Sequence, residues 1–119
     1  MKKIDAVWKI FISYILVVFF ILLANNAFGQ MKVIQFNAGW NNANQVSWLD
    51  KLSDCDKDFV DVGTDKEAQK KYQIAVIPTI ILFKDGEEVK RFQADLSFKM
   101  VATKEEVQEE IDNQLMSDF

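Results

Sequence analysis

Short apolar runs separated by polar breaks predict a small α/β domain that begins near residue 31. The first run, Met31–Phe36, has the composition of a β-strand, and a second strand is expected over Phe59–Gly63. Between them we expect a helix over Asn41–Ser53, because its apolar residues recur at every third position, at Val46, Leu49 and Leu52. Asn41 or Asn42 would cap the start of this helix.

The second half of the chain carries the stronger signals. A short helix is expected over Lys66–Tyr72, started by Thr64 or Asp65. An apolar strand follows over Thr79–Phe83. The next residues contain an Asp-Gly pair, whose positive φ angles suit a tight hairpin turn. Glu88–Phe92 should therefore return as an antiparallel edge strand.

The last helix is marked by a capping box. The Thr103 hydroxyl and the Glu106 carboxylate would each accept a hydrogen bond from a free backbone N–H. For residues 93–102 the sequence allows two structures, an extension of the strand or a loop over one end of the sheet. The predicted order is β-α-β-α-β-β-α in a mixed four-stranded sheet, with the first two strands parallel because a helical crossover joins them.

The first 29 residues differ from the remainder. Three lysines precede an apolar run over residues 10–24, and small residues follow at Ala27 and Gly29. This is the pattern of a secretory signal peptide, and cleavage after Gly29 would leave residues 30–119 as the domain. The alternative is an uncleaved membrane anchor that uses residues 6–24, since a spanning helix needs about 20 apolar residues. Both interpretations place the domain outside the cytoplasm, in the periplasm or cell envelope.

Charge and composition exclude several kinds of site. The chain has 14 basic and 18 acidic residues, of which the leader holds three and one, so residues 30–119 carry a net charge of 11 − 17 = −6. An acidic domain repels nucleic acid and anionic lipid, so any membrane contact would come from the leader alone. The chain has no histidine and one cysteine, Cys55. We therefore expect no metal site, no cofactor and no intramolecular disulfide.

Two stretches of the chain carry a resemblance to a known family. Residues 71–86 read Lys-Tyr-Gln-Ile-Ala-Val-Ile-Pro-Thr-Ile-Ile-Leu-Phe-Lys-Asp-Gly, and residues 36–40 read Phe-Asn-Ala-Gly-Trp. They resemble the Tyr-x-Ile-x-x-Ile-Pro-Thr motif of the thioredoxin-like family and the residues that precede its Cys-x-x-Cys motif. The resemblance covers about residues 31–115. It implies a minimal thioredoxin-like fold that lacks the family's first strand and helix.

The departures from this family bear on activity. The two cysteines of the family fall on asparagines here, in the run Trp40-Asn41-Asn42-Ala43-Asn44. Disulfide exchange needs a thiolate, which an amide cannot supply. The family's buried carboxylate falls on Gln35, and its nearby lysine falls at about Phe59, so the proton relay is absent as well. We therefore expect a redox-inactive domain that is not an enzyme.

Three residues retain the elements with which the family holds an extended peptide: Trp40, Ile77 and Pro78. In the family the proline is cis, and the backbone before it pairs with the peptide by strand addition. The resemblance therefore implies a groove that binds a protein or peptide partner without thiol chemistry. The asparagines would line this groove or act only as helix caps. For Trp40 the alternative is a side chain that only packs against its neighbours.

Cys55 is the one residue that could support residual thiol chemistry. Asp54, Asp56 and Asp58 surround it, and their like charge should raise the pKa of its thiol. Reactive cysteines usually have electropositive surroundings, so a partly buried, small apolar role is expected. The sequence allows two alternatives to a peptide-binding function. One is an oxidoreductase that works through Cys55 alone, and the other is a purely structural domain in which residues 93–102 fill the groove.

Overall fold

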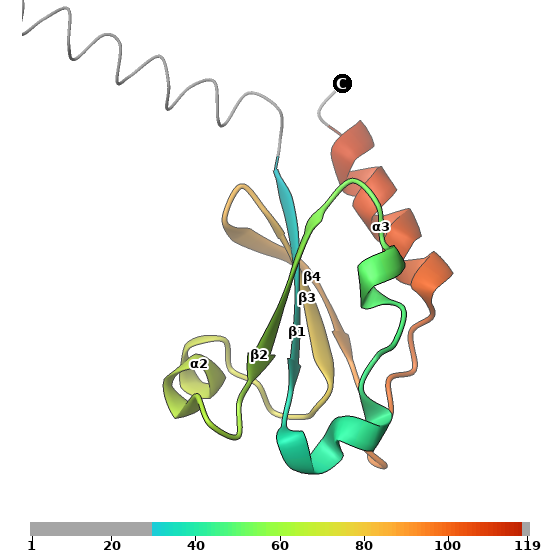
Figure 1. Ribbon diagram of the computed structural model, residues 1–119. Helices are drawn as coiled ribbons and strands as arrows, with labels where there is room; N and C mark the ends of the chain where they lie inside the picture. Colours follow the sequence, from blue (N-terminus) through green and yellow to red (C-terminus); the bar gives the residue numbers. More distant parts are fainter. Residues whose placement is uncertain (1–29, 118–119) are drawn as a thin grey trace, which may run out of the picture.

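A four-stranded mixed sheet with helices on both faces organises residues 30–117, which are the residues described by the computed structural model (Figure 1). The strands, in the order β2-β1-β3-β4 across the sheet, are β1 (Met31–Asn37), β2 (Asp56–Asp61), β3 (Thr79–Lys84) and β4 (Glu87–Gln93). β1 is parallel to β2 and antiparallel to β3, which is antiparallel to β4. The expected leader, residues 1–29, lies outside the described residues. Within residues 30–117, no helix has the length and apolar character needed to cross a membrane.

The central strands β1 and β3 are apolar on both faces because both faces of the sheet are covered. On one face, α3 (Lys104–Met116) packs Val107 and Ile111 against alternate strand residues, namely Val33, Ile80 and Leu82. On the other face, α2 (Lys66–Lys71) and the segment after it cover Ile34, Phe36 and Ile81. Figure 1 shows α2 and α3 on opposite sides of the sheet. The alternation along each strand follows from the two-residue period of a pleated backbone.

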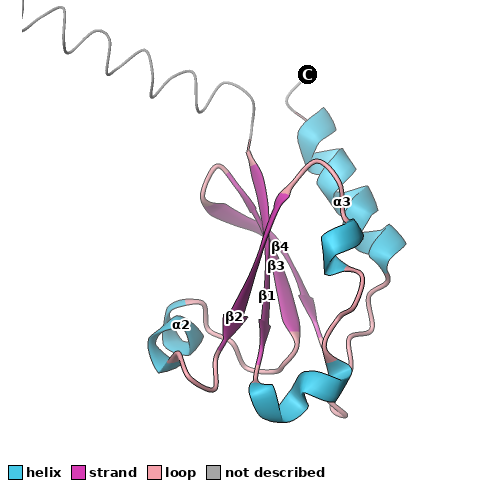
Figure 2. Cartoon of the chain, in the orientation of Figure 1, coloured by secondary structure: helices cyan, strands magenta, loops and turns pink. Residues whose placement is uncertain are grey.

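The connection from β1 to β2 contains no α-helix, so the helix predicted over residues 41–53 is wrong. Two short 3₁₀ helices, η1 (Gly39–Asn44) and η2 (Leu49–Lys51), replace it (Figure 2). Asparagine side chains compete with helical backbone bonds, and this segment is rich in asparagine. In addition, Gln35 Oε1 accepts the Val46 N–H at 2.9 Å, which bonds this backbone to the sheet instead of to a helical turn. Val46 and Leu52 still reach the core, as their spacing predicted.

Some of the predicted strand boundaries and helix caps agree with the structure, and others do not. β2 begins at Asp56, earlier than the expected Phe59, because parallel pairing with Lys32 brings a polar segment into the edge of the sheet. The expected asparagine cap is wrong, since η1 begins after Ala38 with no side-chain cap. Asp65 does cap α2, by accepting the Ala68 N–H at 3.0 Å.

The remaining local predictions concern the hairpin and the last helix. Asp85 and Gly86 have φ angles of 53° and 86°, as the Asp-Gly turn required. Half of the capping box forms, because the Thr103 hydroxyl accepts the Glu106 N–H at 3.2 Å. The Glu106 carboxylate, however, lies 3.4 Å from that same hydroxyl instead of bonding to the Thr103 backbone.

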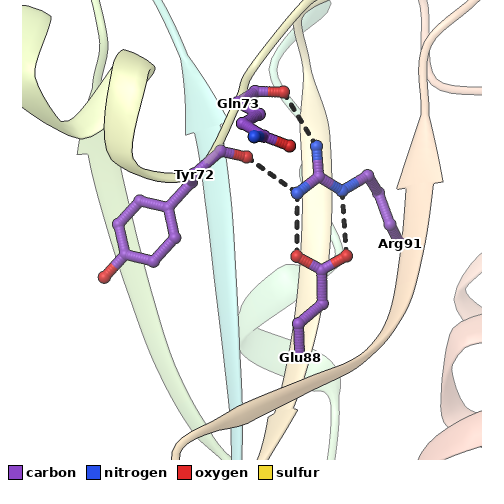
Figure 3. A network of polar contacts seen from close by, with 4 residues as sticks. All are labelled: Tyr72, Gln73, Glu88 and Arg91. Carbon is purple, nitrogen blue, oxygen red and sulfur yellow. Dashed lines mark hydrogen bonds and ion pairs between the residues drawn. The ribbon is translucent and has the colours of Figure 1, made fainter.

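Arg91 of β4 ties the end of α2 to the sheet (Figure 3). Its guanidinium donates to the carbonyl oxygens of Tyr72 at 2.7 Å and Gln73 at 3.0 Å. The same group forms a bidentate pair with the Glu88 carboxylate, at 2.8 and 3.1 Å. The segment that runs from α2 toward Ile77 therefore starts from a fixed point.

The backbone at this point forms a Schellman motif, a common way of ending a helix. The Gln73 N–H donates to the Lys70 carbonyl at 3.2 Å, and the Ile74 N–H donates to the Gln69 carbonyl at 3.0 Å. The geometry places Gln73 at φ 53°, in the left-handed region that favours glycine. A side chain at this position is therefore mildly strained.

Replacing Gln73 with glycine should stabilise the domain. We expect Gln73→Gly to raise the free energy of unfolding by roughly 1 kcal/mol, because it removes the steric cost of the left-handed conformation. Urea unfolding of the full chain, followed by circular dichroism, measures the change. Gln69→Gly, inside α2, is the matched control and should lower stability by roughly 0.5 kcal/mol. A loss of stability in Gln73→Gly would contradict this interpretation.

Candidate functional site

Asn41, to which the resemblance assigns the position of the family's first cysteine, is buried, with 4% of its surface exposed. Its Nδ2 donates to Asn37 Oδ1 at 3.1 Å and to the Phe98 carbonyl at 3.2 Å. Its Oδ1 accepts from Asn44 Nδ2 at 2.8 Å. Asn37 Nδ2 in turn donates to the Asn41 carbonyl at 3.3 Å. Both polar atoms of the Asn41 side chain are therefore engaged in joining the end of β1, η1 and a distant loop.

This asparagine network is a structural arrangement with no reactive group. Amide side chains neither ionise near neutral pH nor act as adequate nucleophiles toward a disulfide. The asparagines were expected to cap a helix or line a groove, and Asn41 and Asn44 instead bond to each other. Asn42 and Ala43 between them are exposed.

Gln35, at the position of the family's buried carboxylate, is 1% exposed and has its Oε1 bonded to the Val46 N–H. The β1–β2 register places Phe59 directly opposite it, as the sequence comparison suggested. The two positions to which the resemblance assigns the family's proton relay thus hold an amide and a phenyl ring. Neither group can transfer a proton at physiological pH.

Residues 93–102, which the sequence left open, form a hairpin-like loop after β4. Ala94 bridges Met100, and the Phe98 N–H donates to the Asp95 carbonyl at 3.1 Å. Hydrogen bonds from the Ser97 hydroxyl, and then from the Lys99 backbone, hold the pKa of the Asp95 carboxyl below its usual range. Phe98 has a φ of 63°, a left-handed conformation that is strained for a bulky residue.

The strained residue is the one that contacts the asparagine network. Phe98 offers its carbonyl to Asn41, and its ring stands edge-on to Trp40, with centroids 5.3 Å apart and planes at 87°. Trp40 is 70% exposed and Phe98 is 41% exposed. The sequence identified Trp40 but not Phe98, whose only signal was an unusual number of apolar residues in a short loop. This exposure argues against the alternative in which Trp40 only packs inside the domain.

A cavity of about 190 Å³ opens beside this aromatic pair. Trp40, Phe98 and Ile77 line it together with Val62 and Ile74, and α2 adds two polar side chains, Lys66 and Gln69. The Ile77–Pro78 peptide bond is cis, as the resemblance implied. Pro78 itself is fully buried and does not line the cavity, in contrast to the expected groove.

Ile77, in the bend before β3, has unpaired backbone groups and lines this cavity. Within residues 30–117, neither its N–H nor its C=O has a hydrogen-bond partner. A backbone donor and acceptor that lack partners inside the protein are available to an added peptide. The site therefore combines an exposed aromatic pair, a small apolar cavity and a free backbone edge.

Cys55 lies apart from this site. It is partly buried against the core on the α3 face and does not line the cavity. Burial is the main cause that raises the pKa of its thiol; Lys57 opposes this shift, and Asp56 and Asp54 add to it. The direction agrees with the sequence analysis, although burial outweighs the acidic neighbours. Among the described residues, no group of acidic or cysteine side chains is arranged to hold a metal ion.

Comparison with known proteins supports the fold. No family model matches the chain. The curated thioredoxins of Mycobacterium tuberculosis and Mycobacterium bovis are 53% identical to it over 32 residues, a stretch that covers 27% of this chain and 28% of the relatives. The chain thus matches little more than a quarter of the length of these relatives, and their activity does not transfer with the match.

Solved structures extend the similarity to most of the domain. A mutant thioredoxin from Halobacterium salinarum superposes with a TM-score of 0.59 at 20% identity, over 72% of this chain and 75% of that one. Schistosoma mansoni thioredoxin gives a TM-score of 0.57 at 26% identity, over 77% and 82%. The domain therefore has a thioredoxin-like fold, and it has one cysteine where a Cys-x-x-Cys motif needs two.

Removing the Asn41 side chain should destabilise the domain. Asn41→Ala removes the hydrogen-bond partner of Asn37 Oδ1, of Asn44 Nδ2 and of the Phe98 carbonyl, and we expect a loss of about 1–3 kcal/mol in the free energy of unfolding. Urea unfolding of the full chain measures it. The adjacent exposed residue supplies the control, because Asn42→Ala should change stability by less than about 0.5 kcal/mol. Equal effects of the two substitutions would show that the network contributes nothing.

Proposed function

We propose that this protein is an exported, redox-inactive thioredoxin-like module that binds an extended segment of a protein partner in the cell envelope. The observation that supports binding most directly is the open Ile77 backbone beside the exposed Trp40–Phe98 pair. Main-chain bonds to Ile77 would supply affinity, and the cavity would accept one apolar side chain of the partner. Export rests on the leader pattern of residues 1–29, and N-terminal sequencing of protein from the envelope fraction should find Gln30 first if the leader is cleaved.

The residues at the expected cysteine positions support the proposal of redox inactivity. Asn41 is buried and fully bonded, so it offers a substrate neither a nucleophile nor an exposed polar group. Cys55 is a poor substitute, because burial disfavours its thiolate and the residue does not line the cavity. A purely structural role required residues 93–102 to fill the groove, whereas Phe98 forms one wall of a cavity that stays open.

Redox inactivity is tested by insulin reduction with dithiothreitol as the electron donor. We expect the full chain and its Cys55→Ser variant to give the same turbidity rate as dithiothreitol alone, since neither has an accessible thiolate at the site. Activity in the full chain that disappears in Cys55→Ser would overturn the redox-inactive proposal. Such a result would make Cys55 the reactive group despite its raised pKa.

Binding is tested with the insulin B chain after its cysteines have been carboxymethylated, which leaves an extended peptide with no thiol. We expect Trp40→Ala and Phe98→Gly to weaken its binding to the full chain at least about tenfold, measured by calorimetry. Phe98→Gly is informative because glycine relieves the left-handed strain while keeping the carbonyl that Asn41 binds. Loss of binding in that variant would therefore not reflect unfolding.

The matched control is Phe59→Ala, which removes an aromatic ring of similar exposure, 42%, that does not line this cavity. Its affinity for the carboxymethylated peptide should equal that of the unaltered chain. Unchanged binding in Trp40→Ala and Phe98→Gly, or no binding by any variant, would count against the groove.

A further inference from the structure

The β2 strand leaves one side of the sheet open. Within the described residues it pairs only with β1, and the sheet ends at its other side. Asp56, Lys57, Asp58 and Phe59 are all exposed along this edge. An unpaired strand edge is a ready template for another strand, and proteins commonly protect such edges with charge.

One backbone donor on this edge is covered by a neighbouring carboxylate. The Val62 N–H donates inward to the Asn37 carbonyl at 2.9 Å, so the alternation of a strand directs the Phe59 N–H toward the open side. That N–H donates to Asp58 Oδ1 at 2.8 Å, and the other oxygen of this carboxylate lies 3.8 Å from Lys32 Nζ. A cation brought by another chain would compete for the Asp58 carboxylate and release the Phe59 N–H.

A cavity of about 460 Å³ lies along the same strand, on the face of the sheet that carries α3. Val46, Leu49 and Phe59 give it apolar walls, and Lys57 and Gln35 contribute polar groups. Gln35 is 99% buried, its Oε1 is taken by Val46, and its Nε2 has no hydrogen-bond partner within residues 30–117. No fully buried side-chain polar atom among the described residues lacks a partner, so Nε2 keeps some exposure. Because Gln35 lines the cavity, this N–H can donate to an acceptor on a ligand that enters there.

We infer that the open edge of β2 binds an extended, basic segment of a partner protein by strand addition. The partner backbone would pair with the outward groups of β2. Its basic side chains would lie beside Asp56 and Asp58 on the α2 face. An amide side chain at the alternate position would enter the cavity, and its carbonyl would accept a hydrogen bond from Gln35 Nε2. Main-chain pairing with alternate side-chain pockets is the general mode by which exposed sheet edges recognise peptides.

Charge selects this occupant over a second copy of the chain. Two β2 edges would bring the acidic residues of one strand against those of the other, and like charges on paired strands are destabilising. The surface also shares no residue with the Trp40 cavity. A test of one site therefore does not decide the other.

The test uses the isotopically labelled full chain in a non-ionic detergent and two-dimensional amide NMR. The probe is the capped peptide acetyl-Lys-Val-Lys-Gln-Lys-Val-amide, whose lysines share one face and whose glutamine lies on the other. We expect it to shift the backbone amides of residues 56–61 and the Gln35 side-chain amide. The matched peptide with glutamate in place of lysine should bind at least about tenfold more weakly.

Two variants separate edge pairing from general charge attraction. Lys57→Pro removes a backbone N–H that points outward like that of Phe59 and should abolish binding, whereas Lys57→Ala removes only the side chain from the cavity wall, keeps the N–H and should bind more tightly than Lys57→Pro. Asp56→Lys should bind the lysine peptide more weakly and the glutamate peptide more tightly, which tests the proposal even if Lys57→Pro fails to fold. Equal affinity for the two peptides, shifts centred on Trp40 and Phe98, or self-association through β2 in the absence of peptide would each overturn it.

Discussion

Asn41 joins the end of β1 and the turn of η1 to a loop 57 residues away in the chain, through hydrogen bonds of a side chain that is almost wholly buried. Its amide connects the end of β1 at Asn37 with the turn of η1 at Asn44 and with the carbonyl of Phe98. The position of Phe98 beside Trp40 depends on this connection, and so does the wall of the cavity. An unpaired amide at this depth would cost about 1–3 kcal/mol, and the hydrogen bonds to Asn37, Asn44 and Phe98 avoid this cost.

At the position that the resemblance assigns to the first cysteine, the side chain has a structural part in the fold. A thiolate needs access to solvent or substrate, whereas an amide with donor and acceptor groups is stable only when both are bonded. The asparagines satisfy each other and the loop, so the surface above them is left to the rings of Trp40 and Phe98. What the site presents to the outside is therefore mainly apolar, and its polar groups are the unpaired backbone of Ile77 and the side chains of Lys66 and Gln69.

Much of the fold was readable from the sequence because the relevant signals are local. The apolar run of β3, the turn at Asp85-Gly86 and the cap at Asp65 each depend on neighbouring residues, and each is present. The β1–β2 crossover was misread because one long-range bond, from Val46 to Gln35, decides its path. The resemblance located the degenerate cysteine positions, but the role of Phe98 follows from a contact with Asn41 across 57 residues of sequence. No local pattern specifies such a contact, and the left-handed conformation of Phe98 runs against its residue type.

The hydrogen bonds of Arg91 help to fix the backbone that a ligand would meet at the cavity. By holding the carbonyls of Tyr72 and Gln73, Arg91 fixes the start of the short segment that leads to Ile77, while β3 holds the other end. The receiving backbone is thus ordered before any partner arrives. A partner that pairs with it would lose its own conformational freedom but would not have to order the protein, so the entropy cost of association falls mainly on one side of the interface.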